Sequence, residues 1–118
     1  MMEYIIKTDF PEHSMTAIIE GTEKNEDEKG SSIETWSIKT IAGGKKAFVH
    51  IVDAWENKGC VILSANNKNG EIRATFHYWT SCGETEKHPY DAKYMLGRFT
   101  ELILVHFESC YDKIIIES

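Results

Sequence analysis

The chain has 118 residues, with 19 acidic against 13 basic side chains and a formal net charge of −6. This balance disfavours a nucleic-acid-binding protein, because binding to phosphate backbones depends mainly on Lys and Arg side chains. At 42% hydrophobic residues, a chain of this length is expected to fold as a single domain, residues 1–118, around a core of its own. No apolar run reaches the roughly 20 residues that a membrane-spanning helix needs, so we predict no membrane partner.

The first ten residues, MMEYIIKTDF, contain neither a basic segment nor a long apolar one, so no signal peptide is predicted. The three cysteines, Cys60, Cys82 and Cys110, include no CxxC pair. An odd number of cysteines in a chain without a secretory signal is typical of reduced thiols, which predicts a cytoplasmic protein.

The N-terminal third begins with a predicted strand over residues 3–10, which Pro11 ends. Residues 14–20 fit either a short helix or a strand. Residues 21–32 are polar, begin with a glycine and contain no large apolar side chain, which predicts a loop or a long hairpin tip. The most acidic part of the chain overlaps this segment, because residues 20–29 hold five carboxylates and two lysines.

Four segments rich in β-branched and aromatic residues follow, with turn residues between them. Asn69-Gly70 is the strongest of the turn signals, because a type I′ hairpin turn needs positive φ at two successive residues. Short turns between successive strands predict an antiparallel meander. Its four strands are expected at residues 33–41, 46–53, 60–65 and 71–80.

The last of these strands alternates between apolar and polar side chains, which predicts one buried and one polar face. The buried face would carry Ile72, Ala74, Phe76 and Tyr78. The opposite face would carry Glu71, Arg73, Thr75, His77 and Trp79.

Residues 89–110 place apolar side chains three and four apart, which predicts an amphipathic helix. Pro89 suits its first turn, where Asp91 also complements the helix dipole. In the alternative, residues 100–107 form a strand paired with residues 113–117; we prefer the helix, followed by 113–117 as the last strand. The predicted class is α+β: an antiparallel meander sheet of four to six strands with one C-terminal amphipathic helix packed on a face.

The segment FHYWTSCGETEKHPYD, residues 76–91, concentrates side chains that could bind a metal. Structural zinc sites usually draw pairs of ligands, two to four residues apart, from two separate knuckles. Here there is one loose cluster and no second knuckle, so we predict no metal and no other cofactor. The cluster consists of His77, Cys82 and His88, with His50 or Asp53 as a further candidate ligand.

The same segment has residue types found in catalytic sites. Cys82 and His88 resemble a thiolate–imidazole pair that Asp91 could orient, but a flexible loop between them does not fix their geometry. The alternative function is therefore a small-ligand-binding protein or hydrolase that uses His50, His77, Cys82 and His88. In one version His50 and His77 act as general base and acid, with Lys39 or Arg73 holding a phosphate.

In a purely structural alternative, residues 81–88 are an exposed, charged connection between a strand and a helix. A binding surface without catalysis adds a function to that arrangement. Arg73, His77 and Trp79 on one sheet face, beside Glu84 and Glu86, would give an aromatic centre with a charged rim. Protein-binding hot spots are enriched in Trp, Tyr and Arg and surrounded by a polar rim.

The acidic run adds a second feature, because Glu23, Glu26, Asp27 and Glu28 would steer a cationic partner and raise its association rate. In size and charge the chain is similar to bacterial immunity proteins, which neutralise basic nuclease toxins; secreted-effector chaperones share the profile. We therefore expect an antitoxin-type inhibitor that occludes a basic protein partner, without direct nucleic-acid binding and without enzymatic activity.

This hypothesis makes two structural demands. Trp79 has to be accessible, and the acidic run has to lie on the same side of the molecule. The enzyme alternative instead requires its histidines and Cys82 to converge in one pocket. The chain would be a monomer, or a weak homodimer formed by pairing of sheet edges.

Overall fold

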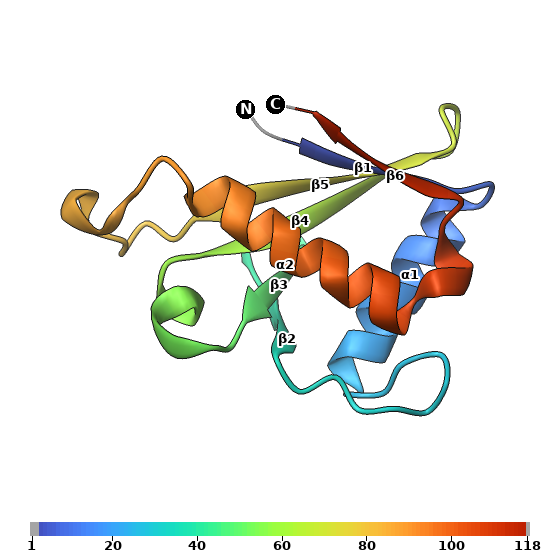
Figure 1. The fold of residues 1–118 in the computed structure, drawn as a ribbon, viewed down its shortest axis with the longest axis horizontal. Helices are drawn as coiled ribbons and strands as arrows, with labels where there is room; N and C mark the ends of the chain where they lie inside the picture. The colour runs from blue at the N-terminus through green and yellow to red at the C-terminus, as the bar shows by residue number, and fades with distance from the viewer. Residues whose placement is uncertain (1–2, 118) are drawn as a thin grey trace.

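The computed structural model describes residues 3–117, without the side chains of Asp53 and Glu117. It contains a six-stranded antiparallel sheet and two α-helices (Figure 1), which confirms the predicted α+β class. The strands are β1 (Glu3–Lys7), β2 (Trp36–Thr40), β3 (Lys46–His50), β4 (Gly59–Asn66), β5 (Glu71–Tyr78) and β6 (Lys113–Glu117). The helices are α1 (Pro11–Glu23) and α2 (Asp91–His106), and short 3₁₀ helices are η1 (Ala42–Gly44), η2 (Asp53–Asn57), η3 (Glu84–Glu86) and η4 (Glu108–Cys110).

The sheet has the strand order β2-β3-β4-β5-β1-β6. β2 to β5 follow one another as antiparallel hairpins, which confirms the predicted meander. β1 pairs with β5 on one side and with β6 on the other, so the first and last strands lie side by side (Figure 1). The two edges of the sheet are therefore β2 and β6.

The β4–β5 hairpin forms at the Asn-Gly signal, but its turn is not the predicted type I′ turn. The turn spans residues 67–70, and within it Gly70 has a positive φ of 62° whereas Asn69 does not. The Asn66 side-chain oxygen accepts hydrogen bonds from the N–H groups of Lys68 (3.0 Å) and Asn69 (3.3 Å). An Asx-type turn thus replaces the two positive φ angles of a type I′ turn.

The segment that the sequence left open between helix and strand, residues 14–20, lies in α1. Pro11 is the first residue of this helix, where its missing N–H costs no helical hydrogen bond. The helix runs on to Glu23, so the first residues of the predicted acidic loop are helical. The structure thus has a second helix that the sequence did not specify.

The strand alternative for residues 100–107 is wrong, because α2 continues through this segment to His106. Its period of 3.6 residues directs Leu102 and Ile103 into the core, with 3% and 0% of their surface exposed. The helix begins at Asp91, so Pro89 precedes the first turn instead of lying in it.

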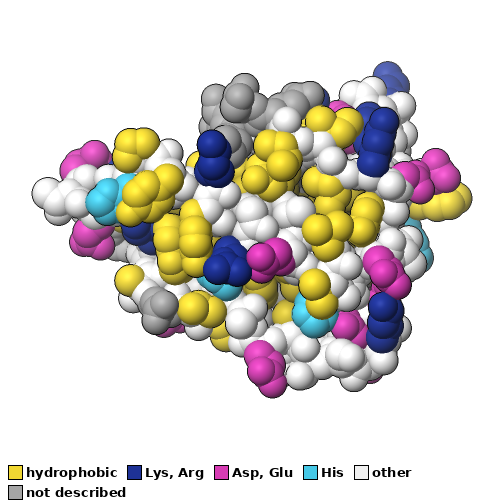
Figure 2. All heavy atoms as spheres, in the orientation of Figure 1, with side chains coloured by type: hydrophobic (Ala, Val, Ile, Leu, Met, Phe, Trp, Pro, Cys, Tyr) yellow, Lys and Arg dark blue, Asp and Glu magenta, His cyan; other side chains and the backbone are white. Residues whose placement is uncertain are grey.

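α1 and α2 pack on one face of the sheet and share a single core cluster. Ile18 of α1 and Phe99 of α2 are fully buried there, and the Phe99 ring meets Phe48 and Trp36 edge-on at centroid distances of 5.0 and 5.6 Å. Burial of each such side chain contributes about 2 kcal/mol. Figure 2 shows this helix-bearing face, on which hydrophobic side chains still emerge in patches between scattered charges.

We call the opposite face of the sheet the open face. Lys39 of β2 reaches across it to place its ammonium 4.9 Å from the ring centroid of Trp79, which follows β5. Ala47 and Cys60 lie on the strands between them and are buried, although neither belongs to the core cluster that the helices share. Long polar side chains thus cover the apolar residues of this face, as lysine stems often do.

The β5–α2 connection is anchored at its end by Asp91, which is fully buried. Its carboxylate accepts hydrogen bonds from the Tyr78 hydroxyl (2.6 Å), the His88 N–H (2.8 Å) and the Lys58 ammonium (3.0 Å). Burial opposes ionisation of Asp91, but these three donors outweigh it and hold its pKa below the ordinary value. Burial and the neighbouring carboxylate raise the pKa of Tyr78 to about 12.

Candidate functional site

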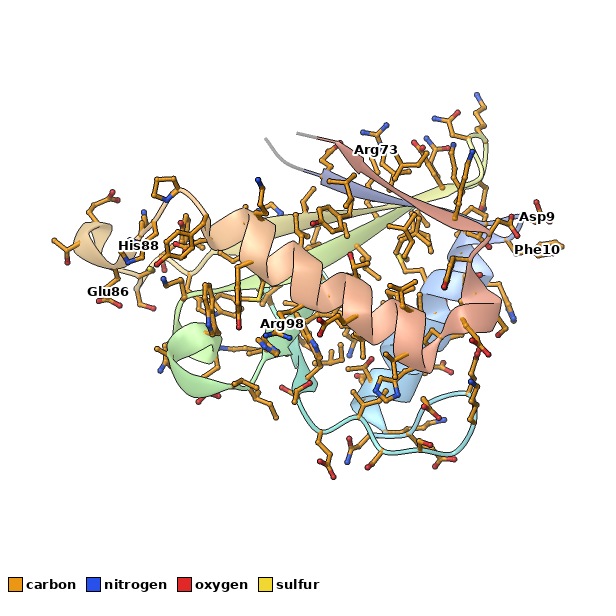
Figure 3. All side chains as sticks on the ribbon, in the orientation of Figure 1. Asp9, Phe10, Arg73, Glu86, His88 and Arg98 are labelled. Carbon is orange, nitrogen blue, oxygen red and sulfur yellow. The ribbon has the colours of Figure 1, made fainter. Side chains whose placement is uncertain are left out.

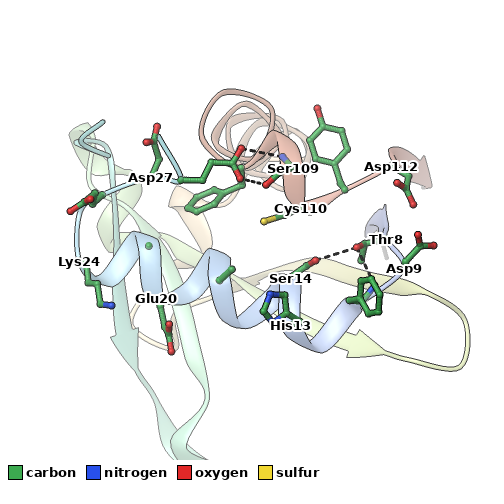
Figure 4. Close-up of a pocket in the computed structure, with 17 residues that line it drawn as sticks. Thr8, Asp9, His13, Ser14, Glu20, Lys24, Asp27, Ser109, Cys110 and Asp112 are labelled. Carbon is green, nitrogen blue, oxygen red and sulfur yellow. Dashed lines mark hydrogen bonds between the residues drawn. The ribbon is translucent and has the colours of Figure 1, made fainter. Parts of the chain in front are cut away.

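A groove of about 740 Å³ lies between α1 and the segment that joins α2 to β6 (Figure 4). We call it the acidic groove, because the described residues that line it include six carboxylates against a single lysine, Lys24, and His13. Phe107 and Cys110 give it an apolar floor. The six carboxylates belong to Asp9, Glu20, Glu26, Asp27, Glu28 and Asp112.

Gly21 lets the acidic loop fold back against α1 to form one end of the groove. A Cβ atom at this position would lie 2.8 Å from the Phe107 ring and 2.9 Å from the Glu26 carbonyl oxygen. After α1 ends, Asn25 adopts a positive φ of 58°, and the Glu26 N–H donates to the Gly21 carbonyl at 2.9 Å. The reversal brings the loop's carboxylates back beside the helix.

Asp27 closes this loop. Its Oδ1 accepts hydrogen bonds from the N–H groups of Lys29 and Ser31, both at 2.8 Å, and its Oδ2 accepts one from His106 Nδ1 at 2.7 Å. The bond from His106 is the main reason that the pKa of Asp27 lies below its ordinary value; the two backbone donors add to it, against the opposing effect of burial. Both carboxylate oxygens of Asp27 therefore already accept hydrogen bonds from within the chain.

Glu28 fastens the same loop to η4. Its carboxylate accepts hydrogen bonds from the Ser109 N–H at 3.1 Å and from the Ser109 hydroxyl (Figure 4). Lys29 and Glu108 form an exposed ion pair beside it, at 3.0 Å. The rim of the groove is thus tied to the α2–β6 connection at several points.

Four carboxylates of the groove remain without an intramolecular partner. Across the part of the chain that the structure describes, their side chains make neither a hydrogen bond nor an ion pair. Beside them Phe10 projects from the end of the molecule with 70% of its surface exposed (Figure 3). The groove therefore combines uncompensated negative charge, an apolar floor and an exposed aromatic ring. The four residues are Asp9, Glu20, Glu26 and Asp112.

The predicted binding residues of β5 do lie together on the open face, but their polar groups are used within the chain. Arg73 pairs with Glu3 at 2.6 Å and with Glu71 at 3.1 Å. The His77 ring nitrogen Nε2 lies 2.8 Å from the Thr75 hydroxyl. Trp79, expected to be accessible, is half-buried, and its Nε1 donates to the Glu56 carbonyl at 2.9 Å.

Glu84 and Glu86 lie on η3, in the loop that projects at the opposite end of the long axis from Asp9 and Phe10 (Figures 1 and 3). Glu84 is paired with Lys87 at 2.7 Å. These two glutamates are thus remote from the acidic groove.

The acidic run does not lie on the same side as Trp79, so this expectation is wrong. α1 packs on the helix-bearing face and extends to Glu23, so the loop that follows it is held against α2 and η4. Glu23 itself points to the β2–β3 hairpin, where it pairs with Lys46 at 3.1 Å. Of the four predicted acidic residues, Glu26, Asp27 and Glu28 line the groove.

The histidines and Cys82 of the enzyme alternative do not converge. His50 packs on Trp36 in the helix-bearing layer, with its Nδ1 donating to the Thr35 carbonyl at 3.1 Å, whereas His77 is exposed on the open face. His88 stacks on Tyr90 in the projecting loop, and Asp91 accepts a bond from its backbone N–H, not its imidazole. Cys82 is buried, and all three cysteines are free.

No group of three metal-ligating side chains is found among the residues that the structure describes. The side chain of Asp53, a candidate ligand in the sequence, lies outside the described residues. In the described part of the chain, neither helix is long and apolar enough to cross a membrane.

Comparison with protein-family models, with curated proteins and with solved structures gives no match. The function therefore has to be argued from the side chains of this chain and their arrangement.

Proposed function

We propose that this chain is an acidic protein-binding module that holds a basic segment of a protein partner in the acidic groove. The observation that carries the proposal is a set of four carboxylates around an apolar floor that have no partner among the residues that the structure describes. The chain would act on this partner by occluding it, as an immunity or antitoxin-type inhibitor does.

Lys and Arg side chains fit this groove chemically. Their aliphatic stems bury well on apolar surface while the charged head stays at its edge. Phe107 and Cys110 would receive the stem, and Glu20 and Glu26, both exposed, would meet the head. The exposed ring of Phe10 adds a surface for a cation–π contact, which is worth about 0.5–1 kcal/mol at exposed sites.

The fastened rim supports an inhibitor over a chaperone. Asp27 and Glu28 fix the loop to α2 and η4, so the groove is formed before any partner arrives. A preformed site loses little conformational entropy on binding, which favours tight occlusion of one partner over loose escort of many.

The experiment compares two double variants with equal loss of charge. Glu20→Gln with Glu26→Gln neutralises the groove, and Glu84→Gln with Glu86→Gln neutralises the projecting loop. Tagged wild-type chain and both variants are used to capture proteins from the native host along a salt gradient, and each is titrated with an oligo-arginine peptide. We expect the groove variant to release a basic captured protein at lower salt than the wild-type chain does. It should bind the peptide roughly tenfold more weakly, with a slower association rate and an affinity that depends less on salt.

Equal behaviour of the two variants would contradict the proposal, because general negative charge would then explain the binding. Loss of binding in the loop variant alone would move the interface to the opposite end of the molecule.

A further inference from the structure

We propose that β6 pairs antiparallel with β6 of a second copy of the chain, so that the sheet continues across a two-fold axis. This inference concerns the free edge of the sheet and does not depend on the acidic groove. Edge strands present unpaired backbone N–H and C=O groups, which are a template for a further strand.

The backbone groups that face this edge follow from the register. Thr8 N–H donates to the Gly70 carbonyl at 3.0 Å and continues the β1–β5 register, so even-numbered residues of β1 bond to β5. In an antiparallel ladder the backbone groups of successive residues point to opposite sides. Ile5 therefore bonds to its β6 partner Ile115, and the outward-facing groups on β6 are those of its even-numbered residues.

A second copy aligned about Ile115 matches these groups. Ile114 of each copy then stands opposite Ile116 of the other, and both residues have their N–H and C=O directed at the shared edge. Each such pair exchanges two hydrogen bonds, so the symmetric dimer gains four. Alignments displaced by a single residue would set an outward-facing residue against an inward-facing one and lose these bonds.

The sequence of β6, Lys-Ile-Ile-Ile-Glu, is self-complementary in the same alignment. Lys113 of each copy stands opposite Glu117 of the other, which gives two pairs of opposite charge. Pairs of this kind stabilise neighbouring antiparallel strands, whereas like charges directly opposite destabilise them.

Within one copy, the register places residues of like charge opposite each other on β6 and β1. The register sets Lys113 opposite Lys7 and Glu117 opposite Glu3. Lys7 is already paired with Glu71, at 3.4 Å, and among the described residues the Lys113 side chain has no hydrogen-bond or ion-pair partner. A second copy supplies the opposite charge that β1 does not.

The apolar side chains of β6 point to the same conclusion. Ile116 lies on the helix-bearing face with 62% of its surface exposed, and Ile114 on that face is half-buried. In the dimer Ile116 of one copy packs beside Ile114 of the other. The other edge strand, β2, reads Trp-Ser-Ile-Lys-Thr and offers no charge match when paired with itself. The self-complementary edge is therefore β6.

Sedimentation velocity over a range of concentrations tests the proposal on the full chain. We expect a reversible monomer–dimer equilibrium that high salt weakens. Lys113→Glu or Glu117→Lys alone sets like charges opposite each other and should raise the dimer Kd roughly tenfold or more. The double variant, Lys113→Glu with Glu117→Lys, restores opposite charges and should restore the dimer.

Ile116→Pro provides a second test, because it removes an N–H that faces the free edge and leaves the bonds to β1 in place. Its circular dichroism should match wild type while the dimer is lost. A chain that stays monomeric at the highest concentration, or a dimer that neither single charge variant nor the proline weakens, would overturn the proposal.

Discussion

The acidic groove and the loop between β5 and α2 stand at opposite ends of a molecule 41 Å long, and both are rich in carboxylates. They use these carboxylates differently. The loop is anchored by Asp91, which is fully buried with three donors, and its exposed Glu84 is paired with Lys87. In the groove, Asp27 and Glu28 accept hydrogen bonds that hold the rim in place. The remaining carboxylates have no donor in the described chain.

A carboxylate can either hold the fold together or bind another molecule, and a count of charged residues does not distinguish these two roles. A carboxylate surrounded by donors holds the backbone in place, and its removal should lower stability. A carboxylate that the fold presents without donors contributes little to stability and is available to another molecule. The following changes test this division, beginning with the one that should cost most.

Asp91→Ala should have the largest effect. It leaves the Lys58 ammonium, whose side chain is only 13% exposed, and the Tyr78 hydroxyl without their acceptor. Breaking a buried ion pair in this way costs about 3 kcal/mol or more. Urea unfolding followed by circular dichroism measures the loss. A midpoint equal to wild type would show that the loop is not anchored through this carboxylate.

Gly21→Ala should cost about 2 kcal/mol, because the new methyl group overlaps the Phe107 ring and the Glu26 carbonyl. Gly97→Ala is the matched control, since a Cβ there meets nothing within 4 Å and lies in α2. Alanine is favoured over glycine in a helix by about 1 kcal/mol, so the control should gain stability. An equal gain in stability from both substitutions would mean that this end of the groove accommodates a side chain and is not rigid.

Acid should remove the stabilisation that the anchored carboxylates provide. The pKa values of Asp27 and Asp91 are lowered in the folded chain, so their stabilisation is present above the ordinary carboxylate pKa of about 4. It is lost as pH falls through the lower folded values. Urea midpoints measured from neutral to acidic pH should decline in this range, and Asp27→Asn should flatten the decline. An unchanged slope in this variant would show that the ionised Asp27 carboxylate does not contribute to the stability of the fold.

The sheet was predictable because its signals are local. The alternation of residues 71–80 assigns each side chain to a face without knowledge of the rest of the chain, and the structure buries Ile72 and Ala74 as expected. The geometry of the turn after β4 was not predictable, because the hydrogen bonds that set it are accepted by Asn66, which lies outside the Asn-Gly pair. Local patterns therefore locate elements better than they describe the junctions between them.

The groove was only partly predictable, because it joins three separate segments. The acidic run indicated Glu26 and Glu28, but Asp9 and Asp112 are isolated carboxylates at strand ends, and nothing in the sequence brings them together. The contact that places the loop, from His106 to Asp27, spans 79 residues.

The projecting loop should show the smallest effects on stability. Glu84 is 87% exposed in its pair with Lys87, and ion pairs of this kind contribute little. Glu84→Gln should therefore leave the urea midpoint unchanged within error, in contrast to Asp91→Ala at the base of the same loop. It should also leave binding of the oligo-arginine peptide unchanged, because a single exposed charge at the far end of the molecule is screened from the groove beyond about 10 Å at ordinary salt. A clear loss of peptide affinity in this variant would mean that the partner contacts the loop, and that a paired carboxylate can serve an interface as well as a free one.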